Sequence, residues 1–175
     1  MDGRPVKIDI GIGFGSNMGD RLANLIKARR LLLDACDDPD RAIFSAVYET
    51  LPVDCAAETN LFYNAVGQFT FSNTPQSILE LCLQIESLLG RSNLHETNAP
   101  RTIDLDLLYA GKIVTETHQL TIPHPRLTSR LFVLIPLAEI RPELQLPGDR
   151  FSVTDHLKSL SLPTLKFPIV TKDWQ

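Results

Sequence analysis

The alternation of apolar and polar residues predicts a series of β-strands along this chain. Between Lys7 and Phe14 apolar side chains alternate with small or polar ones, so Val6, Ile8, Ile10 and Ile12 share one side. Further strands are expected at Ala42–Glu49, at Phe62–Phe71, around Asp104 and Asp106, and over the short run Lys112–Val114.

Two amphipathic segments between these strands have the period and the caps of α-helices. Asp20 can cap a first helix that runs to about Ala35, and Thr74 followed by Pro75 can open a second that ends at Gly90. The first helix is expected to present Arg21, Lys27, Arg29 and Arg30 to water. The second is expected to bury Ile78, Cys82, Ile85 and Leu89. Further helices are predicted at Arg130–Ile140 and, capped by Ser152, from Val153 to about Leu160.

The order strand, helix, strand, strand, helix, strand is typical of one fold class. It predicts an α+β, ferredoxin-like split βαβ arrangement (βαββαβ), an antiparallel sheet with helices on one face and additional C-terminal elements. The second face of the sheet would then be available for loops and a ligand. The length of 175 residues fits one domain, residues 1–175.

The stretch from Pro100 to Tyr109 is the strongest candidate for chemistry. On a strand, Ile103, Leu105 and Leu107 share one face, and Asp104 and Asp106 share the other. Two carboxylates that point the same way from an apolar strand need a positive partner or a cation between them. Hard oxygen ligands suit Mg²⁺ or Mn²⁺. The alternative is an edge strand with two solvated acids.

Glycine and proline mark the expected turns and loops. The run from Gly13 to Asp20 lacks the lysine and the spacing of phosphate-binding loops, so a tight strand-to-helix turn is the preferred interpretation. Residues 51–61 and 91–99 have little periodicity and are expected to be loops, the second one flexible. The segment Ile122–Arg126, with His124 between two prolines, is expected to be stiff.

Composition narrows the function. The net charge of −4 and the pI of about 5.5 argue against a nucleic-acid-binding protein, which would carry a basic face. Cys36, Cys55 and Cys82 show no metal-binding or redox spacing and are expected to be reduced. No leader and no apolar run of about 18 residues is present, so we expect a cytoplasmic protein with no membrane contact. A monomer is expected, with a dimer as the alternative.

Several motifs, in order along the chain, resemble those of 6-hydroxymethyl-7,8-dihydropterin pyrophosphokinase, an enzyme family of folate biosynthesis. The strongest are Pro100–Leu108, with the sequence PRTIDLDLL, and Ile122–Arg126, with the sequence IPHPR. Weaker matches are Gly13–Arg21, Ser45–Val53, Phe62–Val66, Ile85–Glu86 with Gly90–Arg91, and Arg130–Leu137.

The resemblance implies transfer of the β- and γ-phosphates of ATP, as one unit, to the hydroxymethyl oxygen of the pterin, with two Mg²⁺ ions and release of AMP. Asp104 and Asp106 match the metal ligands, and Arg91 and Arg101 match the arginines that meet the transferring phosphates. The implied ATP contacts are Glu86, Thr121, His124 and Arg130. Without the family, a solvated arginine or a rigid-turn histidine would explain these residues equally well.

The resemblance also implies a pterin site. Phe62 and Phe132 match the two residues that sandwich the ring, and Asn64 matches the side chain that reads its edge. Thr50, Leu51 and Val53 match a loop that supplies backbone contacts. Seen alone, the two phenylalanines would be interpreted as core aromatics. Asn64 is harder to explain in that way, because an asparagine within an apolar strand must find hydrogen bonds.

The sequence departs from the family in the loop between Arg91 and Pro100. Asn93, Thr97 and Asn98 stand where members carry arginines and an aromatic residue. Slower turnover, compensation by His95 or a different loop mechanism would follow. Two alternatives to the active enzyme therefore remain: a non-catalytic pterin- or nucleotide-binding protein, and a metal-dependent hydrolase that uses the aspartate pair and His124. A zinc site of His95, His118 and His124 lacks the required spacing.

Overall fold

The computed structural model describes residues 6–52, 60–90, 100–160 and 167–175. The expectations for Val53, Arg91 and the loop 91–99 lie outside these ranges. A sheet of six strands forms the centre of the molecule. Its strands are β1 (Ile8–Ser16), β2 (Ile43–Phe44), β3 (Val47–Thr50), β4 (Phe62–Phe71), β5 (Asp104–Ala110) and β8 (Ile169–Thr171).

The strand order confirms the ferredoxin-like prediction. The order across the sheet is β5-β1-β4-β3-β8, with β2 paired to β4, and all these pairs are antiparallel. Strand β1 lies between β4 and β5, so the two longest ladders of the sheet meet on it.

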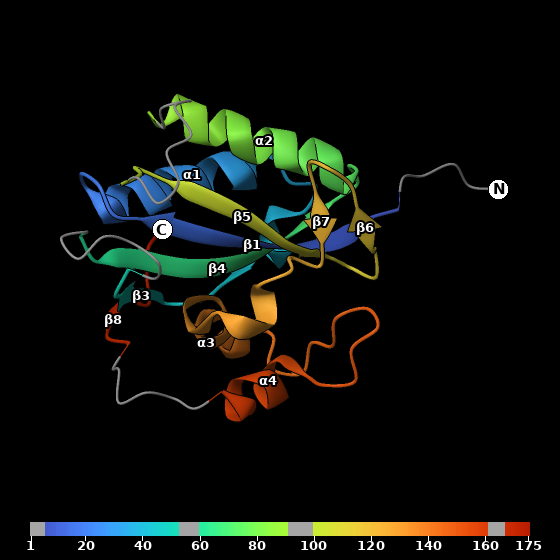
Figure 1. The fold of residues 1–175 in the computed structure, drawn as a ribbon. Helices are drawn as coiled ribbons and strands as arrows, with labels where there is room; N and C mark the ends of the chain where they lie inside the picture. Colours follow the sequence, from blue (N-terminus) through green and yellow to red (C-terminus); the bar gives the residue numbers. More distant parts are fainter. Residues whose placement is uncertain (1–5, 53–59, 91–99, 161–166) are drawn as a thin grey trace.

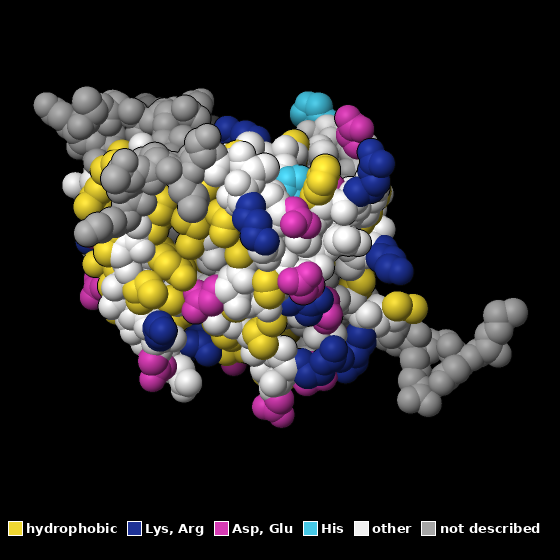
Figure 2. Space-filling model, turned by 90° about the horizontal axis from the view of Figure 1, so that it is seen from below, with side chains coloured by type: hydrophobic (Ala, Val, Ile, Leu, Met, Phe, Trp, Pro, Cys, Tyr) yellow, Lys and Arg dark blue, Asp and Glu magenta, His cyan; other side chains and the backbone are white. Residues whose placement is uncertain are grey.

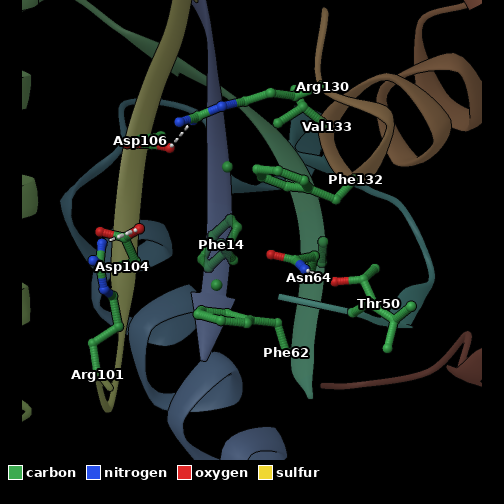
Figure 3. Close-up of a pocket in the computed structure, with 14 residues that line it drawn as sticks. Phe14, Thr50, Phe62, Asn64, Arg101, Asp104, Asp106, Arg130, Phe132 and Val133 are labelled. Carbon is green, nitrogen blue, oxygen red and sulfur yellow. Dashed lines mark hydrogen bonds and ion pairs between the residues drawn. The ribbon is translucent and has the colours of Figure 1, made fainter. Parts of the chain in front are cut away.

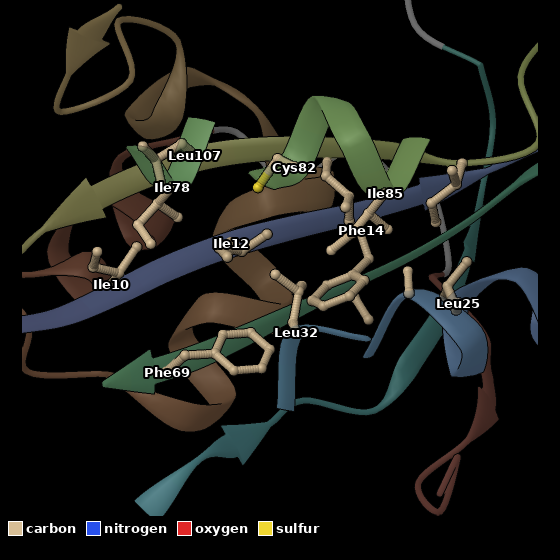
Figure 4. Close-up of a cluster of buried hydrophobic side chains, with 14 of the residues drawn as sticks. Ile10, Ile12, Phe14, Leu25, Leu32, Phe69, Ile78, Cys82, Ile85 and Leu107 are labelled. Carbon is tan, nitrogen blue, oxygen red and sulfur yellow. The ribbon is translucent and has the colours of Figure 1, made fainter. Parts of the chain in front are cut away.

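Helices α1 (Arg21–Ala35) and α2 (Pro75–Leu88) cover one face of the sheet (Figure 1). Ile10, Ile12 and Phe14 of β1 project toward them into the main core (Figure 4). The predicted caps are present, because Asp20 accepts a hydrogen bond from the Ala23 amide and Thr74 accepts one from the Ser77 amide. Of the predicted stripe on α2, Ile78, Cys82 and Ile85 are buried.

The second face of the sheet is only partly open. Helix α3 (Leu131–Ile140) packs on it over β4 and β3, and α4 (Val153–Ser159) packs on α3 (Figure 1). A second apolar cluster, which includes Val66, Leu134 and Leu137, joins α3 to the sheet. The space left between α3 and the ends of β1, β4 and β5 is the site described below. Seen from this side, apolar side chains gather on one part of the surface and charged ones are spread over the rest (Figure 2).

Two predicted strands differ from the structure. The expected strand Ala42–Glu49 is divided into β2 and β3 at Ser45 and Ala46. Here side chains take part in the hydrogen bonding: the Ser45 hydroxyl accepts from the Val66 amide of β4, and Glu139 accepts from the Ala46 amide. The predicted strand Lys112–Val114 is wrong. Gly111, at φ +52°, turns the chain there. Pairing resumes between β6 (Thr115–Glu116) and β7 (Thr121–Ile122).

The interpretation of the glycine-rich run and of the first helix also needs correction. Gly13 and Gly15 lie inside β1, and only Gly19, at φ +61°, lies in the turn. Arg21 and Arg29 do not simply face water: the Arg29 guanidinium lies 4.0 Å from the centre of the Phe44 ring, and Arg21 contacts three other residues. Both guanidinium groups cover aromatic rings, a favourable contact for this flat cation.

The C-terminal residues 167–175 pack on the core. Strand β8 pairs with β3, and Trp174 is 2% exposed. Its indole contacts the rings of Phe14 and Phe44 edge to face, and its Nε1 donates to the Ser45 carbonyl at 2.9 Å. Residues 167–175 therefore cover the outer edge of β3.

Because Trp174 is fully packed, Trp174→Ala should lower the free energy of unfolding by about 3–5 kcal/mol. Urea unfolding followed by circular dichroism measures this change. Phe151→Ala is the control, because Phe151 is 58% exposed and its loss should change the free energy little. Equal stability of the two variants would contradict the packing role of Trp174.

Candidate functional site

The floor of the site is a part of β1 without side chains. Gly15 pairs with Asn64 of β4 and Asp104 of β5, and Gly13 pairs with Val66 and Asp106. Directly paired residues project from the same face of a sheet, so the glycines leave open space between the acidic strand and the Asn64 strand. This space is a pocket, and residues of β1, β3, β4, β5 and α3 line it.

Two aromatic side chains form walls of this pocket. Phe62 comes from the first position of β4 and Phe132 from the first turn of α3. Their rings lie on either side of the region that Asn64 faces (Figure 3). Such a slot, with two apolar faces and an amide at its edge, suits a flat heteroaromatic ring.

Asn64 is buried and its amide is held in one orientation. Its Nδ2 donates to the Thr50 hydroxyl at 2.6 Å, and both side chains are less than a tenth exposed. Its Oδ1 lies beside Gly15, where an added Cβ would be only 3.2 Å away. The Thr50 hydroxyl therefore accepts the hydrogen bond from the Asn64 amide nitrogen. The Asn64 oxygen then lies as an acceptor next to the pocket floor.

Each acid of the pair has its own arginine. Arg101 Nη1 lies 2.8 Å from Asp104 Oδ2, and Arg130 Nη1 lies 3.4 Å from Asp106 Oδ2 (Figure 3). Both aspartates line the pocket, while Ile103, Leu105 and Leu107 are buried on the opposite side, as the alternation predicted. The two arginines supply the positive charge that the sequence analysis required.

The Asp106 carboxyl is hard to ionise. Partial loss of solvent and the neighbouring Asp104 charge raise its pKa to about 6, although Arg130 and Arg101 oppose the shift and the side chain is still 36% exposed. A cation between the two carboxylates would relieve both causes, since it replaces lost solvation and separates like charges. The site is thus electrostatically prepared for a positive ligand.

Backbone contacts hold the acidic strand in place. The Ser16 hydroxyl donates to the Thr102 carbonyl at 2.5 Å, and Asn17 Oδ1 accepts from the Arg101 amide at 2.7 Å. On the other side, Glu86 of α2 is 3% exposed and accepts from the Leu105 amide at 2.7 Å. The Glu86 carboxylate thereby holds the main chain between the two aspartates. Its implied contact with ATP stays a prediction.

A second cavity adjoins the first at Asp106. Thr121, His118 and His124 contribute to its lining. The His124 Nδ1 accepts from the Arg126 amide at 3.1 Å, which leaves the hydrogen on Nε2. Burial and the charges of Arg130 and Arg126 lower the pKa of His124 to about 4, so its ring is a neutral donor at pH 7.

The structure brings together most of the residues that the resemblance singled out. Thr50, Leu51, Phe62, Asn64, Arg101, Asp104, Asp106, Arg130 and Phe132 line the first pocket. Thr121 and His124 line the second. Gly13, Gly15 and Val133 also line the first pocket, and the sequence analysis missed them. The strict alternation of isoleucine or phenylalanine with glycine in Ile10–Gly15 was the signal for the floor.

The donor set fits Mg²⁺, which binds one or two carboxylates and takes its other ligands from water and phosphates. In the described part of the chain no group of three or more His, Cys, Asp or Glu residues could hold a metal ion. Two carboxylates, Asp104 and Asp106, match the protein share of such a site.

The fold and the site define a ferredoxin-like protein whose pocket joins an acidic pair, arginines and an aromatic slot, a combination suited to phosphoryl transfer onto a flat ring compound. The sequence profile of the 7,8-dihydro-6-hydroxymethylpterin-pyrophosphokinase (HPPK) family matches residues 11–142. The chain belongs to this family, which confirms the resemblance seen in its motifs.

Several relatives carry corresponding names. A 2-amino-4-hydroxy-6-hydroxymethyldihydropteridine pyrophosphokinase of Bacillus subtilis is 41% identical over 134 residues, 77% of this chain and 78% of the relative. The folic acid synthesis protein FOL1 of Dictyostelium discoideum is 33% identical over 87% of this chain, which spans 22% of that protein. A crystal structure of wild-type Plasmodium falciparum HPPK-DHPS shares the fold, with a TM-score of 0.66 over 90% of this chain and 42% of that one, at 16% identity.

Thr50→Val should misorient Asn64, because valine keeps the shape of threonine but removes the acceptor of the amide. We expect a loss of about 1–3 kcal/mol in the free energy of unfolding, the cost of a buried unpaired donor. Urea unfolding measures it. Thr50→Ser keeps the hydroxyl, so its free energy of unfolding should fall much less. If the valine variant were as stable as the serine variant, the hydrogen bond would not hold Asn64.

The raised pKa of Asp106, about 6, predicts a pH-dependent stability in metal-free protein. Between about pH 4, the ordinary pKa of an aspartate, and about pH 6, Asp106 keeps its proton in the folded state and releases it in the unfolded state. The free energy of unfolding should therefore fall as pH rises through this window. Asp106→Asn should therefore gain stability over the wild type from pH 4 to pH 7. Urea unfolding in the presence of a chelator tests this, with the exposed Asp40→Asn as control. A difference that does not grow with pH would contradict the assignment.

Proposed function

We propose that this chain transfers diphosphate from ATP to the hydroxymethyl group of 6-hydroxymethyl-7,8-dihydropterin, with release of AMP, in folate biosynthesis. The observation that carries the proposal is that one pocket contains both the Asp104/Asp106 pair and the Phe62/Phe132 slot. A flat ring in the slot would place a substituent toward the acidic pair. The names of the relatives support the same reaction.

The pterin would lie between Phe62 and Phe132, with its edge toward the Asn64 oxygen. The amide oxygen accepts a hydrogen bond, so it would select a ring edge that carries N–H donors. Leu51, which lines the pocket and is 55% exposed, would supply backbone contacts with Thr50. Val53 is proposed to contribute to the same contact from outside the described residues.

The nucleotide would enter from the second cavity, with its phosphates toward Asp106. Thr121 and His124 line that cavity, and the neutral His124 ring can donate from Nε2 to a phosphate oxygen without a charge. Arg101 and Arg130 each hold an aspartate in the described structure and are long enough to turn to phosphate oxygens. Glu86 and Arg91 complete the proposed nucleotide and phosphate contacts.

Two Mg²⁺ ions, held by Asp104 and Asp106 with the phosphates, would neutralise charge at the transferring group. The residues of the chain position the two partners, so that the hydroxymethyl oxygen attacks the β-phosphorus and the bond to the α-phosphate oxygen breaks. In-line transfer of this kind depends mainly on alignment and on charge neutralisation, which the arginines and the acidic pair would provide.

Residues 1–175 are proposed to work as one domain, as a monomer in the cytoplasm. Cys36 is partly buried and Cys82 is buried, and neither is in a disulfide in the described part of the chain. No helix in the described part of the chain is long and apolar enough to cross a membrane. A non-catalytic binding protein remains the second candidate, because Asn93, Thr97 and Asn98 replace residues that the family places in its catalytic loop.

The decisive measurement is a coupled assay of AMP release with ATP, Mg²⁺ and the hydroxymethyl-dihydropterin. The wild type should release AMP in equal amounts with pterin diphosphate, and Asp104→Ala should lose at least about a hundredfold in rate, because a ligand of the charge-neutralising ion is gone. Asp34→Ala, an exposed acid on α1, is the control.

Three other results would redirect the assignment. Tight binding of pterin and ATP in calorimetry without turnover would identify a binding protein. Release of diphosphate or orthophosphate from ATP without the pterin would identify a hydrolase. An unchanged rate in Asp104→Ala would remove the acidic pair from the mechanism.

A further inference from the structure

Arg21 contacts the two strand ends that border the aromatic slot. Its Nη1 donates to Glu49 Oε1 at 3.1 Å and to the Leu61 carbonyl at 2.8 Å. Its guanidinium carbon lies 3.7 Å from the centre of the Tyr63 ring. One side chain therefore joins the end of β3 to the beginning of β4.

The position of Arg21 in its helix does not explain these contacts. Arg21 is the first residue of α1, where the helix dipole disfavours a positive charge, and the N-cap acid Asp20 beside it accepts from the Ala23 amide. Its ion-pair partner Glu49 comes from β3, on another part of the chain. The contacts that balance the Arg21 charge thus lie in the sheet.

Arg21 acts on the face of the sheet opposite to the pocket. Glu49 pairs with Tyr63, and the next pair along the ladder is Thr50 with Phe62. Successive pairs project to opposite faces, so Arg21 holds the Glu49–Tyr63 pair on the α1 side while Thr50 and Phe62 line the pocket. Arg21 itself is absent from the pocket lining.

The last described rung of the β3–β4 ladder is the Thr50–Phe62 pair. In the described part of the chain two side-chain contacts join these strand ends: the Asn64–Thr50 hydrogen bond on the pocket face, and Arg21 on the opposite face. A guanidinium does so with hydrogen bonds and a stacked ring, a geometry that lysine cannot reproduce.

We infer that Arg21 is a positioning residue for the pterin side of the site: it sets the separation of Thr50 and Phe62 from behind the sheet, and thereby the place of the Asn64 amide and the width of the slot. This inference rests on the proposed function, since the slot is assigned to the pterin. It predicts that Arg21 affects the pterin and not the nucleotide.

Steady-state kinetics of AMP release, with each substrate varied in turn, test the inference in the full chain. Arg21→Ala should raise the KM for the pterin about tenfold and leave the KM for ATP within about twofold, because only one wall of the site moves. Arg21→Lys keeps the charge but loses the stacking on Tyr63, so its KM for the pterin should lie between those of the wild type and Arg21→Ala. Arg30→Ala, an exposed arginine on the same helix, should match the wild type.

Glu49→Gln tests the same contact from the other partner and guards against misfolding of Arg21→Ala. It should raise the KM for the pterin by about threefold, the smaller effect of removing the ion-pair charge while an acceptor remains. Thermal melting monitors the folded fraction of every variant. Calorimetric binding of the pterin, in the presence of a non-hydrolysable ATP analogue, gives an independent readout.

The outcomes separate the two proposals. An active wild type with unchanged pterin KM in Arg21→Ala and Glu49→Gln overturns the inference alone. An equal rise in both KM values, or a loss of rate that tracks the unfolded fraction, also overturns it. A wild type that neither binds the pterin nor releases AMP overturns the proposed function and, with it, the role given to Arg21.

Discussion

Strand β1 carries side chains on only one of its faces at the site, and the arrangement of the site depends on this constraint. Ile10, Ile12 and Phe14 fill the core beneath α1 and α2, while Gly11, Gly13 and Gly15 leave the opposite face bare. Part of this bare face is filled by Tyr109, whose ring lies where a side chain on Gly11 would be. The remainder stays open, and here strands β4 and β5 direct Asn64 and the aspartates to one space.

Two arginines compensate part of the charge of the acidic pair. Two carboxylates beside a bare strand would repel each other, but each is within reach of an arginine that comes from a different direction along the chain. Arg101 lies just before β5, and Arg130 lies just before α3.

The β3 edge links the recognition side of the site to distant parts of the chain. Strand β8 pairs with β3 from outside, Glu139 of α3 accepts from the Tyr48 hydroxyl, and Trp174 binds the Ser45 carbonyl. Burial and the neighbouring Glu139 raise the pKa of Tyr48 to about 12, so this phenol remains a donor. A short strand with few ladder bonds of its own is therefore held by side chains from α1, α3 and the C-terminal segment.

The local sequence pattern alone predicted the order of strands and helices along the chain and the two capped helices. It also predicted that the aspartates and the leucines of β5 point to opposite faces, and its motifs indicated the family. These depend on periodicity and on residue type, which neighbours in the sequence already express. Only the tertiary structure decided that α3 covers part of the second face, that Gly13 and Gly15 form the floor of the pocket, and that Arg21 binds Glu49 and Tyr63. Each of these features depends on which residue, distant in the sequence, the fold places next to the helix, the glycine or the arginine. A glycine in a turn and a glycine under a ligand have the same sequence signature, and an arginine is solvated or paired according to what the fold brings beside it.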